Sequence, residues 1–322
     1  MERHALALKT LGHPERLRIL ALLSRGELTV SELVQILNLS QPRVTQYIKS
    51  LETAGIIERL KEGSWGFSRI RRGNEAISAL VATTLATLPA HDPILTADLR
   101  RLEDVRAERS VAAEAFFANV ANDTGTLGDE YIPKANIESM LRKMAGKGPF
   151  EYMVDLGTGT GRMLEVFADR VTRGSGIDNN VHMLKVARHK LAKNNYNHIR
   201  VRQGDLNSTP LESELADLVT LHQVLHYLDD PQSAIIEAAR LLTRNGIILI
   251  ADFETHDQDE FRSEYAHRRL GFDDNDIEDW LAAAGLSLSR VETIKTQSSR
   301  PNVKIWLGET RISARQKKAK KT

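Results

Sequence analysis

The sequence contains no cysteine, and this absence excludes several kinds of chemistry at once. Without thiols the chain forms no disulfide, binds no metal through thiolates and performs no covalent thiol catalysis. It also lacks any run approaching the roughly 18 consecutive apolar residues needed to cross a bilayer. The start, MERHALALKT, has no apolar signal-peptide core. We therefore expect a cytoplasmic protein with no membrane partner.

The chain has no overall excess of one charge sign, because 44 Lys and Arg face 43 Asp and Glu in 322 residues. The charges are unevenly placed, however. Residues 41–72 carry seven basic and three acidic side chains. Residues 311–322 carry six basic and no acidic ones, so the chain without these last twelve residues has a net charge of −5. The length and the 41% hydrophobic content favour two domains.

The first ninety residues have the pattern of short amphipathic helices separated by turns. Pro14 suits the first turn of a helix, and Thr29 with Glu32 has the spacing of a capping box. Ser40 is a good N-cap for a further helix, which Gly55 ends. The buried face of this helix would consist of Val44, Ile48 and Leu51. Residues 56–70 then predict a two-stranded hairpin around the turn from Gly63 to Gly66, which is a candidate wing.

Two further helical stretches follow, over residues 74–88 and from residue 94 to about 117, with the sequence PAHDP between them. Leu95, Leu99 and Leu102 share one face of the second stretch. This stretch is either a connecting and dimerising helix or a surface helix packed on its own domain, and the sequence favours neither.

After Pro149 short apolar strands alternate with helices. The strand candidates are EYMVDL, GSGI, IRVRQ, ADLVTL and GIILIADF, and helical stretches such as HMLKVARHKLAK and PQSAIIEAARLL separate them. This alternation predicts a parallel sheet with helices on both faces. Ligands of such sheets bind at the carboxyl ends of the strands.

The strongest chemical motif is VDLGTGTGR, in which Asp155 ends a strand and three glycines form the turn into a helix. Glycines adopt positive φ and let the backbone approach a ligand closely. The dinucleotide fingerprint G-x-G-x-x-G fails because Arg162 occupies its last position, and no G-K-S/T completes a P-loop.

From about Phe116 to Gly308 the chain resembles the Rossmann-like S-adenosylmethionine-dependent methyltransferases. The resemblance implies that Asp178 after the next strand accepts the ribose hydroxyls and that Asp205 lies beside the adenine. A carboxylate suits two neighbouring hydroxyl donors. Asp155 and the backbone around Gly157 would hold the methionine ammonium. The cofactor-binding residues expected from the resemblance are Asp155, Gly157, Thr158, Gly159, Gly161, Asp178, Asn179, Asp205, Leu206 and His222.

The pair His222 and His226 forms H-Q-V-L-H, which lacks the glutamate of the zinc-protease motif. We therefore expect no metal, and a packed or hydrogen-bonded His226. Methyl transfer requires mainly positioning, and a base only in some cases, so no residue is obligatory. The catalytic candidates are His222, His256, Tyr265 and His267, the last three in the polar segment after the fifth strand, which could equally be a solvated helix.

Over about its first ninety residues the chain resembles the ArsR/SmtB winged-helix regulators. Thr29 and Ser31 stand where metal sensors of that family carry L-C-V-C, so thiolate sensing by that motif is excluded. The helix from Gln41 to Ala54 would enter the major groove of a double-stranded DNA operator. The expected DNA-contacting residues are Gln41, Arg43, Thr45, Gln46 and Lys49, with Arg69 from the wing.

The sequence thus predicts an α/β protein, with an N-terminal winged helix-turn-helix and a C-terminal Rossmann-like methyltransferase domain built on a mostly parallel seven-stranded sheet. The expected divisions are residues 1–90, a connecting helix at 91–120, the methyltransferase domain at 121–310 and a basic disordered tail at 311–322. We expect a homodimeric transcriptional regulator that methylates a small molecule with S-adenosyl-L-methionine, releasing S-adenosyl-L-homocysteine. The alternative is a non-enzymatic regulator that senses either ligand.

Overall fold

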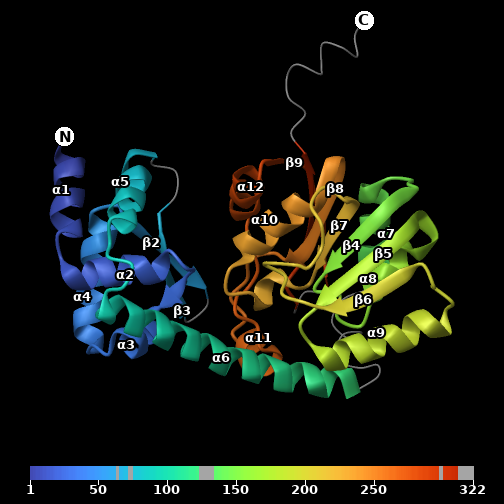
Figure 1. Cartoon of the computed structure of the whole chain (residues 1–322), viewed down its shortest axis with the longest axis horizontal. Helices are drawn as coiled ribbons and strands as arrows, with labels where there is room; N and C mark the ends of the chain where they lie inside the picture. Colours follow the sequence, from blue (N-terminus) through green and yellow to red (C-terminus); the bar gives the residue numbers. More distant parts are fainter. Residues whose placement is uncertain (63–64, 72–74, 123–133, 297–299, 311–322) are drawn as a thin grey trace, which may run out of the picture. The chain divides into compact units, whose positions relative to one another are not determined.

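The computed structural model describes residues 1–62, 65–71, 75–122, 134–296 and 300–310, without the side chains of 3, 61, 62, 65, 75, 109–122, 134 and 135. The chain forms two compact units, Met1–Ala112 and Ala113–Thr322 (Figure 1). Gly63 and Ser64 of the expected wing turn and the expected tail at 311–322 lie outside the described residues.

The first unit is mainly helical, and its helices begin at the sequence signals. Pro14 occupies the first turn of the second helix, and Thr29 and Glu32 form a reciprocal capping box at the start of the third. Ser40 is the N-cap of the fourth helix without a side-chain bond. The helices are α1 (Glu2–Leu11), α2 (Pro14–Leu23), α3 (Val30–Leu37), α4 (Gln41–Thr53), α5 (Glu75–Ala86) and α6 (Pro93–Asn122).

The wing is a sheet of three strands and not of two. Strands β2 (Ile57–Glu62) and β3 (Trp65–Ile70) form the expected antiparallel hairpin. The additional strand β1 (Leu28–Thr29) pairs with β3 through Leu28 and Ser68. Because β1 has only two residues and the capping box follows at once, it shows no alternation that a sequence pattern could reveal.

The first half of α6 packs on the first unit, since Leu102 and Val105 are buried in its core. Asp98 of α6 is 1% exposed and accepts hydrogen bonds from the guanidinium groups of Arg18 and Arg101. The same two guanidinium groups donate to the backbone carbonyls of Leu37 and Ile36 at the end of α3. Of the two readings of this helix, packing on its own domain therefore holds for its first half.

The second unit is built on one seven-stranded sheet with the order β6-β5-β4-β7-β8-β10-β9. The first five strands in this order are parallel to their neighbours, whereas β10 is antiparallel to both β8 and β9. The predicted α/β class and the mostly parallel sheet are confirmed. The strands are β4 (Phe150–Leu156), β5 (Val171–Asp178), β6 (Ile199–Gln203), β7 (Ala216–His222), β8 (Leu242–Phe253), β9 (Leu286–Ile294) and β10 (Val303–Thr310).

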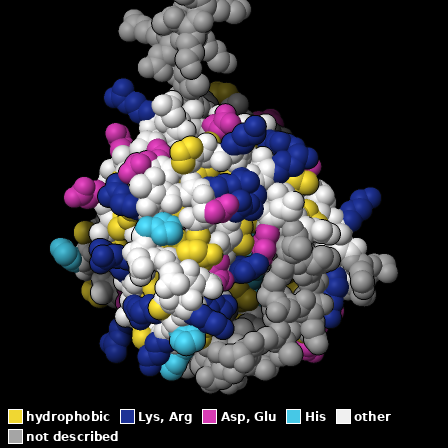
Figure 2. Space-filling model, turned by 90° about the vertical axis from the view of Figure 1, so that its right-hand side faces the viewer, with side chains coloured by type: hydrophobic (Ala, Val, Ile, Leu, Met, Phe, Trp, Pro, Cys, Tyr) yellow, Lys and Arg dark blue, Asp and Glu magenta, His cyan; other side chains and the backbone are white. Residues whose placement is uncertain are grey.

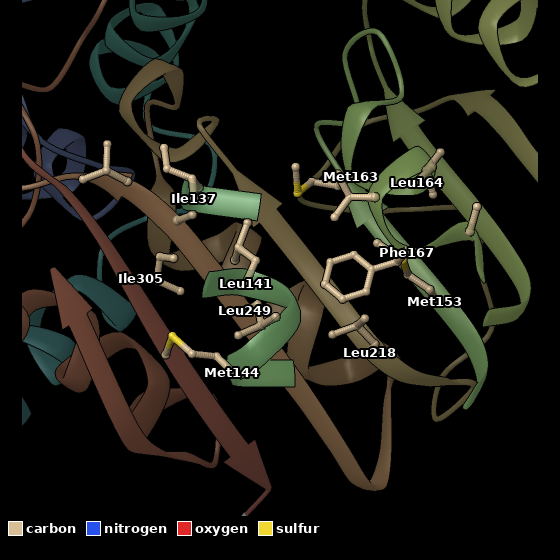
Figure 3. Close-up of a cluster of buried hydrophobic side chains, with 14 of the residues drawn as sticks. Ile137, Leu141, Met144, Met153, Met163, Leu164, Phe167, Leu218, Leu249 and Ile305 are labelled. Carbon is tan, nitrogen blue, oxygen red and sulfur yellow. The ribbon is translucent and has the colours of Figure 1, made fainter. Parts of the chain in front are cut away.

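Helices cover both faces of this sheet, because neighbouring strand residues point to opposite sides. Met153 belongs to the core under α7, α8 and α9, and Val154 belongs to the core under α10 and α12. Figure 3 shows the first of these cores, where Phe167 of α8 and Leu141 of α7 lie over the strands. The helical elements are α7 (Lys134–Ala145), α8 (Arg162–Phe167), η1 (Ala168–Arg170), α9 (Val181–Lys193), η2 (Leu225–Tyr227), α10 (Pro231–Leu241), α11 (Glu260–Tyr265) and α12 (Asp274–Ala283).

Strand β4 lies at the point where the order of the sheet reverses, with β5 on one side and β7 on the other. The turns that leave the carboxyl ends of β4 and β5 diverge there, which creates a crevice in sheets of this kind. The glycine motif follows β4 directly. No helix within the described residues is long and apolar enough to span a membrane.

Candidate functional site

The glycine loop between β4 and α8 has a backbone that only glycine adopts without strain. Gly157, Gly159 and Gly161 all have positive φ, at 73°, 50° and 82°. The Gly157 and Thr158 amides donate to the Ile177 carbonyl of β5, at 2.8 and 3.0 Å. These bonds hold the start of the loop against the neighbouring strand.

Two of the three glycines differ in what surrounds them. A Cβ at Gly157 would lie 2.3 Å from Cγ2 of Val224, whereas a Cβ at Gly159 would meet nothing within 4 Å. Gly157 therefore serves close packing against the segment after β7. Gly159 lies beside open space, where a ligand can approach the backbone.

Asp178 stands at the end of β5 and faces the glycine loop. Its Oδ2 accepts the Gly159 amide at 2.8 Å, and its Oδ1 accepts the Asn180 amide at 2.8 Å. Burial raises the pKa of this carboxyl above its usual value. A carboxylate offers about four lone-pair sites, so each oxygen can accept a further bond from a hydroxyl.

The side chain of Asp155 is buried within the sheet, where it is 2% exposed. The hydroxyl of Thr220 on β7 donates to its Oδ1 at 2.6 Å. Burial raises the pKa of Asp155 to about 6, although the bond from Thr220 acts in the opposite direction. The negative charge of Asp178 adds to the rise. This carboxyl thus lies behind the glycine loop, between β4 and β7.

The other predicted cofactor residues follow the ends of β5, β6 and β7. Asp205 is exposed and accepts the Asn207 amide at 2.9 Å, while Leu206 is buried in the core under α10. Asn179 is exposed after β5, and His222 is half-buried as the last residue of β7. The fold thus brings residues from four parallel strand ends to one edge of the sheet.

Sequence analysis missed Asn180, which is 6% exposed beside the site. Its side-chain oxygen accepts the amides of His182 and Met183 and so caps α9. Its position directly before an amphipathic helix is the signal that could have identified it as a cap.

Three catalytic candidates surround one buried ring. The ring of Phe261 lies 5.0 Å from His256, 5.3 Å from Tyr265 and 5.1 Å from His267 between centroids. Phe261 is 4% exposed and His267 is 7% exposed. The segment after β8 therefore combines both expectations: α11 exposes Glu260, Ser263 and Glu264, and the aromatic rings around Phe261 are packed.

A buried histidine–carboxylate pair adjoins this cluster. His226 Nδ1 lies 2.6 Å from Oδ1 of Asp252, and both side chains are at most 1% exposed. The His267 ring stacks on that of His226 at 3.9 Å, and burial lowers the pKa of His267 far below its usual range. Nε2 of His226 and Nδ1 of His267 have no hydrogen-bond partner among the described residues. His226 is hydrogen-bonded as expected, whereas Asp252 was not singled out, because no sequence pattern links it to His226, 26 residues earlier.

No cluster of three or more metal-ligating His, Asp or Glu side chains exists among the described residues.

The recognition-helix candidates of the first unit share one surface. Val44, Ile48 and Leu51 of α4 are buried, as their spacing predicts. Gln41, Arg43, Thr45, Gln46 and Lys49 are all exposed on the same helix, as are Pro42, Glu52 and Thr53. The arrangement presents polar and basic groups over one face of a helix that follows a tight turn, as a groove-reading helix requires.

Arg69 of β3 differs from those residues, because its side chain is only 14% exposed. It forms ion pairs with Glu58 at 2.7 Å and with Glu27 at 3.5 Å. Its charge is therefore already partnered within the wing.

Fold and site together define a winged-helix unit joined to a Rossmann-like methyltransferase unit. Residues 13–59 match the family described as bacterial regulatory protein, arsR family, and residues 154–250 match the family described as methyltransferase domain. The biofilm growth-associated repressor of Agrobacterium fabrum is 39% identical over 80 residues, which are 24% of this chain and 68% of the repressor. The chain belongs to the arsR family through its N-terminal unit and carries a class I S-adenosylmethionine-dependent methyltransferase domain in its C-terminal unit.

The methyltransferase YcgJ of Bacillus subtilis is 28% identical over 100 residues, or 31% of this chain. The match spans 40% of the length of YcgJ. Its crystal structure aligns with 56% of this chain and all of that chain, with 18% identity and a TM-score of 0.49. Methyltransferase domains of this fold typically bind S-adenosylmethionine.

Proposed function

We propose that the chain is a transcriptional regulator that binds double-stranded DNA through α4 and methylates a small molecule with S-adenosylmethionine. The observation that carries the cofactor assignment is the contact of Asp178 with the glycine loop. Its carboxylate accepts a hydrogen bond from the Gly159 amide at 2.8 Å. Of the three loop glycines, Gly159 is the one that both lies beside open space and donates to a carboxylate. A ribose placed there would meet a fixed acceptor on β5.

The proposed cofactor site also includes Thr158, Asn179, Asp205, Leu206 and His222, and Gly161 shapes the loop. Asp155 supports the methionine end of the cofactor either as a charged carboxylate or as a protonated carboxyl group, because a pKa near 6 makes both forms accessible near neutral pH. When bound, S-adenosylmethionine supplies an activated methyl group. The chain's own residues orient the acceptor and exclude water. His256, Tyr265 and His267 are the candidates on the acceptor side.

Calorimetric titration with S-adenosylmethionine and S-adenosylhomocysteine tests the assignment. Asp178→Ala should weaken binding about 100-fold or more, because two bonds to a charged acceptor contribute roughly 1.5–3 kcal/mol each. Asp279→Ala removes an exposed carboxylate on α12 and serves as the matched control. Both variants should bind DNA like the unaltered chain. Equal cofactor affinity in the Asp178 variant and the control would contradict the ribose assignment.

A second function has support in the packing of the acceptor side. Phe261, His267 and His226 are buried against one another, so His267, one of the candidates proposed for the acceptor side, is packed among other rings. Such a domain suits a sensor that binds S-adenosylmethionine or S-adenosylhomocysteine without turnover. DNA affinity and ligand affinity would then be coupled reciprocally.

The two functions are separated by two measurements on the same preparation. The operator is first selected from random duplexes, and its affinity is measured with and without each ligand. Release of S-adenosylhomocysteine is then followed over a panel of small-molecule acceptors. Turnover supports the enzyme, whereas ligand-dependent DNA binding without turnover supports the sensor.

We also propose that the chain acts as a cytoplasmic homodimer, as DNA-binding winged helices use paired half-sites. Leu6 and Leu8 of α1 and Ile94 of α6 are apolar side chains that remain 42%, 57% and 57% exposed. Sedimentation equilibrium at micromolar concentration tests this. A monomer mass without DNA, together with one chain per operator duplex when DNA is added, would contradict it.

A further inference from the structure

One face of the methyltransferase unit is basic in a way that cofactor binding does not use. The segment from Val181 to Gln203, which forms α9 and β6, contains six Lys and Arg and no Asp or Glu. The rest of the chain therefore carries a net charge of −5. Figure 2 faces the side on which α9 and β6 lie in Figure 1, and Lys and Arg side chains with several His are spread over it, interspersed with Asp and Glu.

Five of these cations form what we call the α9–β6 edge: Lys185, Arg188 and Lys193 of α9, and Arg200 and Arg202 of β6. All five side chains are exposed. On β6 the alternation of the strand buries Ile199 and Val201 and sends both arginines outward. Because β6 is the last strand of the sheet, no further strand covers them.

The cations of this edge are also unpaired. None of the five has an ion pair with a carboxylate among the described residues, although arginines elsewhere in the same unit do. Arg142, Arg162 and Arg240 bind Asp169, Glu138 and Glu237, each at 2.6 Å. The recognition-helix cations Arg43 and Lys49 likewise lack a carboxylate partner in the described part of the first unit. An exposed cation without an internal partner is available to an external anion.

The edge is concave at its centre. Arg188 and Arg200 line a recess of about 350 Å³ between α9 and β6, together with Tyr196 and Asn197. The apolar floor comes from Leu191 and Ile199. An anion in the recess meets guanidinium groups from two elements, and it also meets an amide that can donate a hydrogen bond.

We propose that the α9–β6 edge is a second DNA-binding surface, which contacts backbone phosphates of the duplex that the winged helix occupies. The proposal rests on the proposed DNA binding of the first unit. A duplex held by one unit is present at high effective concentration for the other unit of the same chain. Phosphate contacts of this kind add affinity and register but no sequence preference.

The test compares the salt dependence of DNA binding in two full-length variants. The edge variant carries Lys185→Gln, Arg188→Gln, Arg200→Gln and Arg202→Gln. The control variant carries Lys143→Gln, Lys147→Gln, Arg244→Gln and Lys295→Gln, which are exposed cations of the same unit outside the edge. The probes are a duplex of about 60 base pairs with the selected operator at its centre, longer than two adjacent half-sites, and a random duplex of equal length.

We expect the edge variant to lose up to about 3.6 units from the slope of log affinity against log salt, since each of its four removed phosphate contacts contributes about 0.9. Its affinity should fall at least tenfold at low salt, while its preference for the operator over random DNA stays the same. The control variant should keep the slope of the unaltered chain. Equal slopes for the edge variant and the control on both duplexes would overturn the proposal, and the charges would then only protect a sheet edge from pairing.

The design separates this proposal from the function of the first unit. If the unaltered chain selects no operator, the winged-helix assignment fails, but the slopes on random DNA still decide whether the edge binds phosphates. Should the quadruple variant unfold, the double variant Arg200→Gln with Arg202→Gln replaces it, with an expected slope loss of about two. Retained S-adenosylmethionine binding in each variant shows that the methyltransferase unit is intact.

Discussion

Replacing Gly157 by alanine should destabilise the methyltransferase unit, whereas the same change at Gly159 should mainly impair ligand binding. At Gly157 the new Cβ would lie 2.3 Å from Cγ2 and 2.9 Å from Cβ of Val224. The residue has φ of 73°, and at Gly159 φ is 50° with no neighbour within 4 Å. Both substitutions thus strain the backbone, but only Gly157→Ala also brings a new Cβ into steric conflict with Val224.

The strain of a left-handed residue costs about 1–2 kcal/mol, and forcing a methyl group into a packed site costs about 1–3 kcal/mol more. Gly157→Ala should therefore lower the unfolding free energy of this unit by about 2–5 kcal/mol. At roughly 2–4 °C per kcal/mol, its Tm falls by about 4 °C or more. Gly159→Ala should cost only about 1–2 kcal/mol.

The assay is thermal unfolding by calorimetry, with the transitions of the two units fitted separately, followed by titration with S-adenosylmethionine. Val224→Ala removes the colliding methyl groups, so adding it to Gly157→Ala should recover part of the lost stability. Equal stability losses for the two glycine variants, or no recovery with Val224→Ala, would refute the steric reasoning.

Three other predictions follow from single contacts. Asp155 has a folded pKa near 6 against 3.8 in the unfolded chain, so its contribution to stability is present below pH 4 and is lost as pH rises through 6. Asp155→Asn should therefore gain stability relative to the unaltered chain as pH rises across that interval. A difference in unfolding free energy between the two proteins that stays constant with pH in urea unfolding would contradict this. Arg43→Ala with Lys49→Ala should weaken operator binding and lower the salt slope by up to about two, as fluorescence anisotropy would show; an unchanged slope would remove α4 from the interface. Asp252→Ala should destabilise the second unit by about 3–5 kcal/mol because the buried His226 loses its partner, and a loss below about 1 kcal/mol in urea unfolding would show that the pair contributes little.

The parts of the fold that sequence analysis predicted are those with local, repeated patterns. The strands β4, β5, β7 and β8 are apolar runs between helices, because a parallel sheet buries both faces of its central strands. Neither β9 nor β10 was identified individually, and β9 shows why an edge strand is difficult to detect. Its sequence LSLSRVETI is partly exposed, and the ion pair of Arg290 with Glu292 lies on its surface. Such an edge strand has no continuous apolar run to detect.

The residues of the candidate site also fall into those that sequence patterns could predict and those that they could not. The glycine loop with Asp178 could be found because each element is short in sequence and ends a predicted strand. The pairing of His226 with Asp252 joins residues 26 positions apart, one in η2 after β7 and the other near the end of β8. Only the packing of β7 beside β8 brings them together. Arg69 was predicted from its charge alone, and charge does not reveal the partners Glu58 and Glu27.

The position of Asp98 has a mechanical consequence for α4, the helix proposed to bind DNA. Two guanidinium groups, those of Arg18 and Arg101, join this carboxylate on α6 to the last carbonyls of α3. The turn between α3 and α4 starts at those carbonyls. A shift of the first half of α6 along its axis would therefore be transmitted through these bonds to the turn between α3 and α4, and so to the orientation of α4.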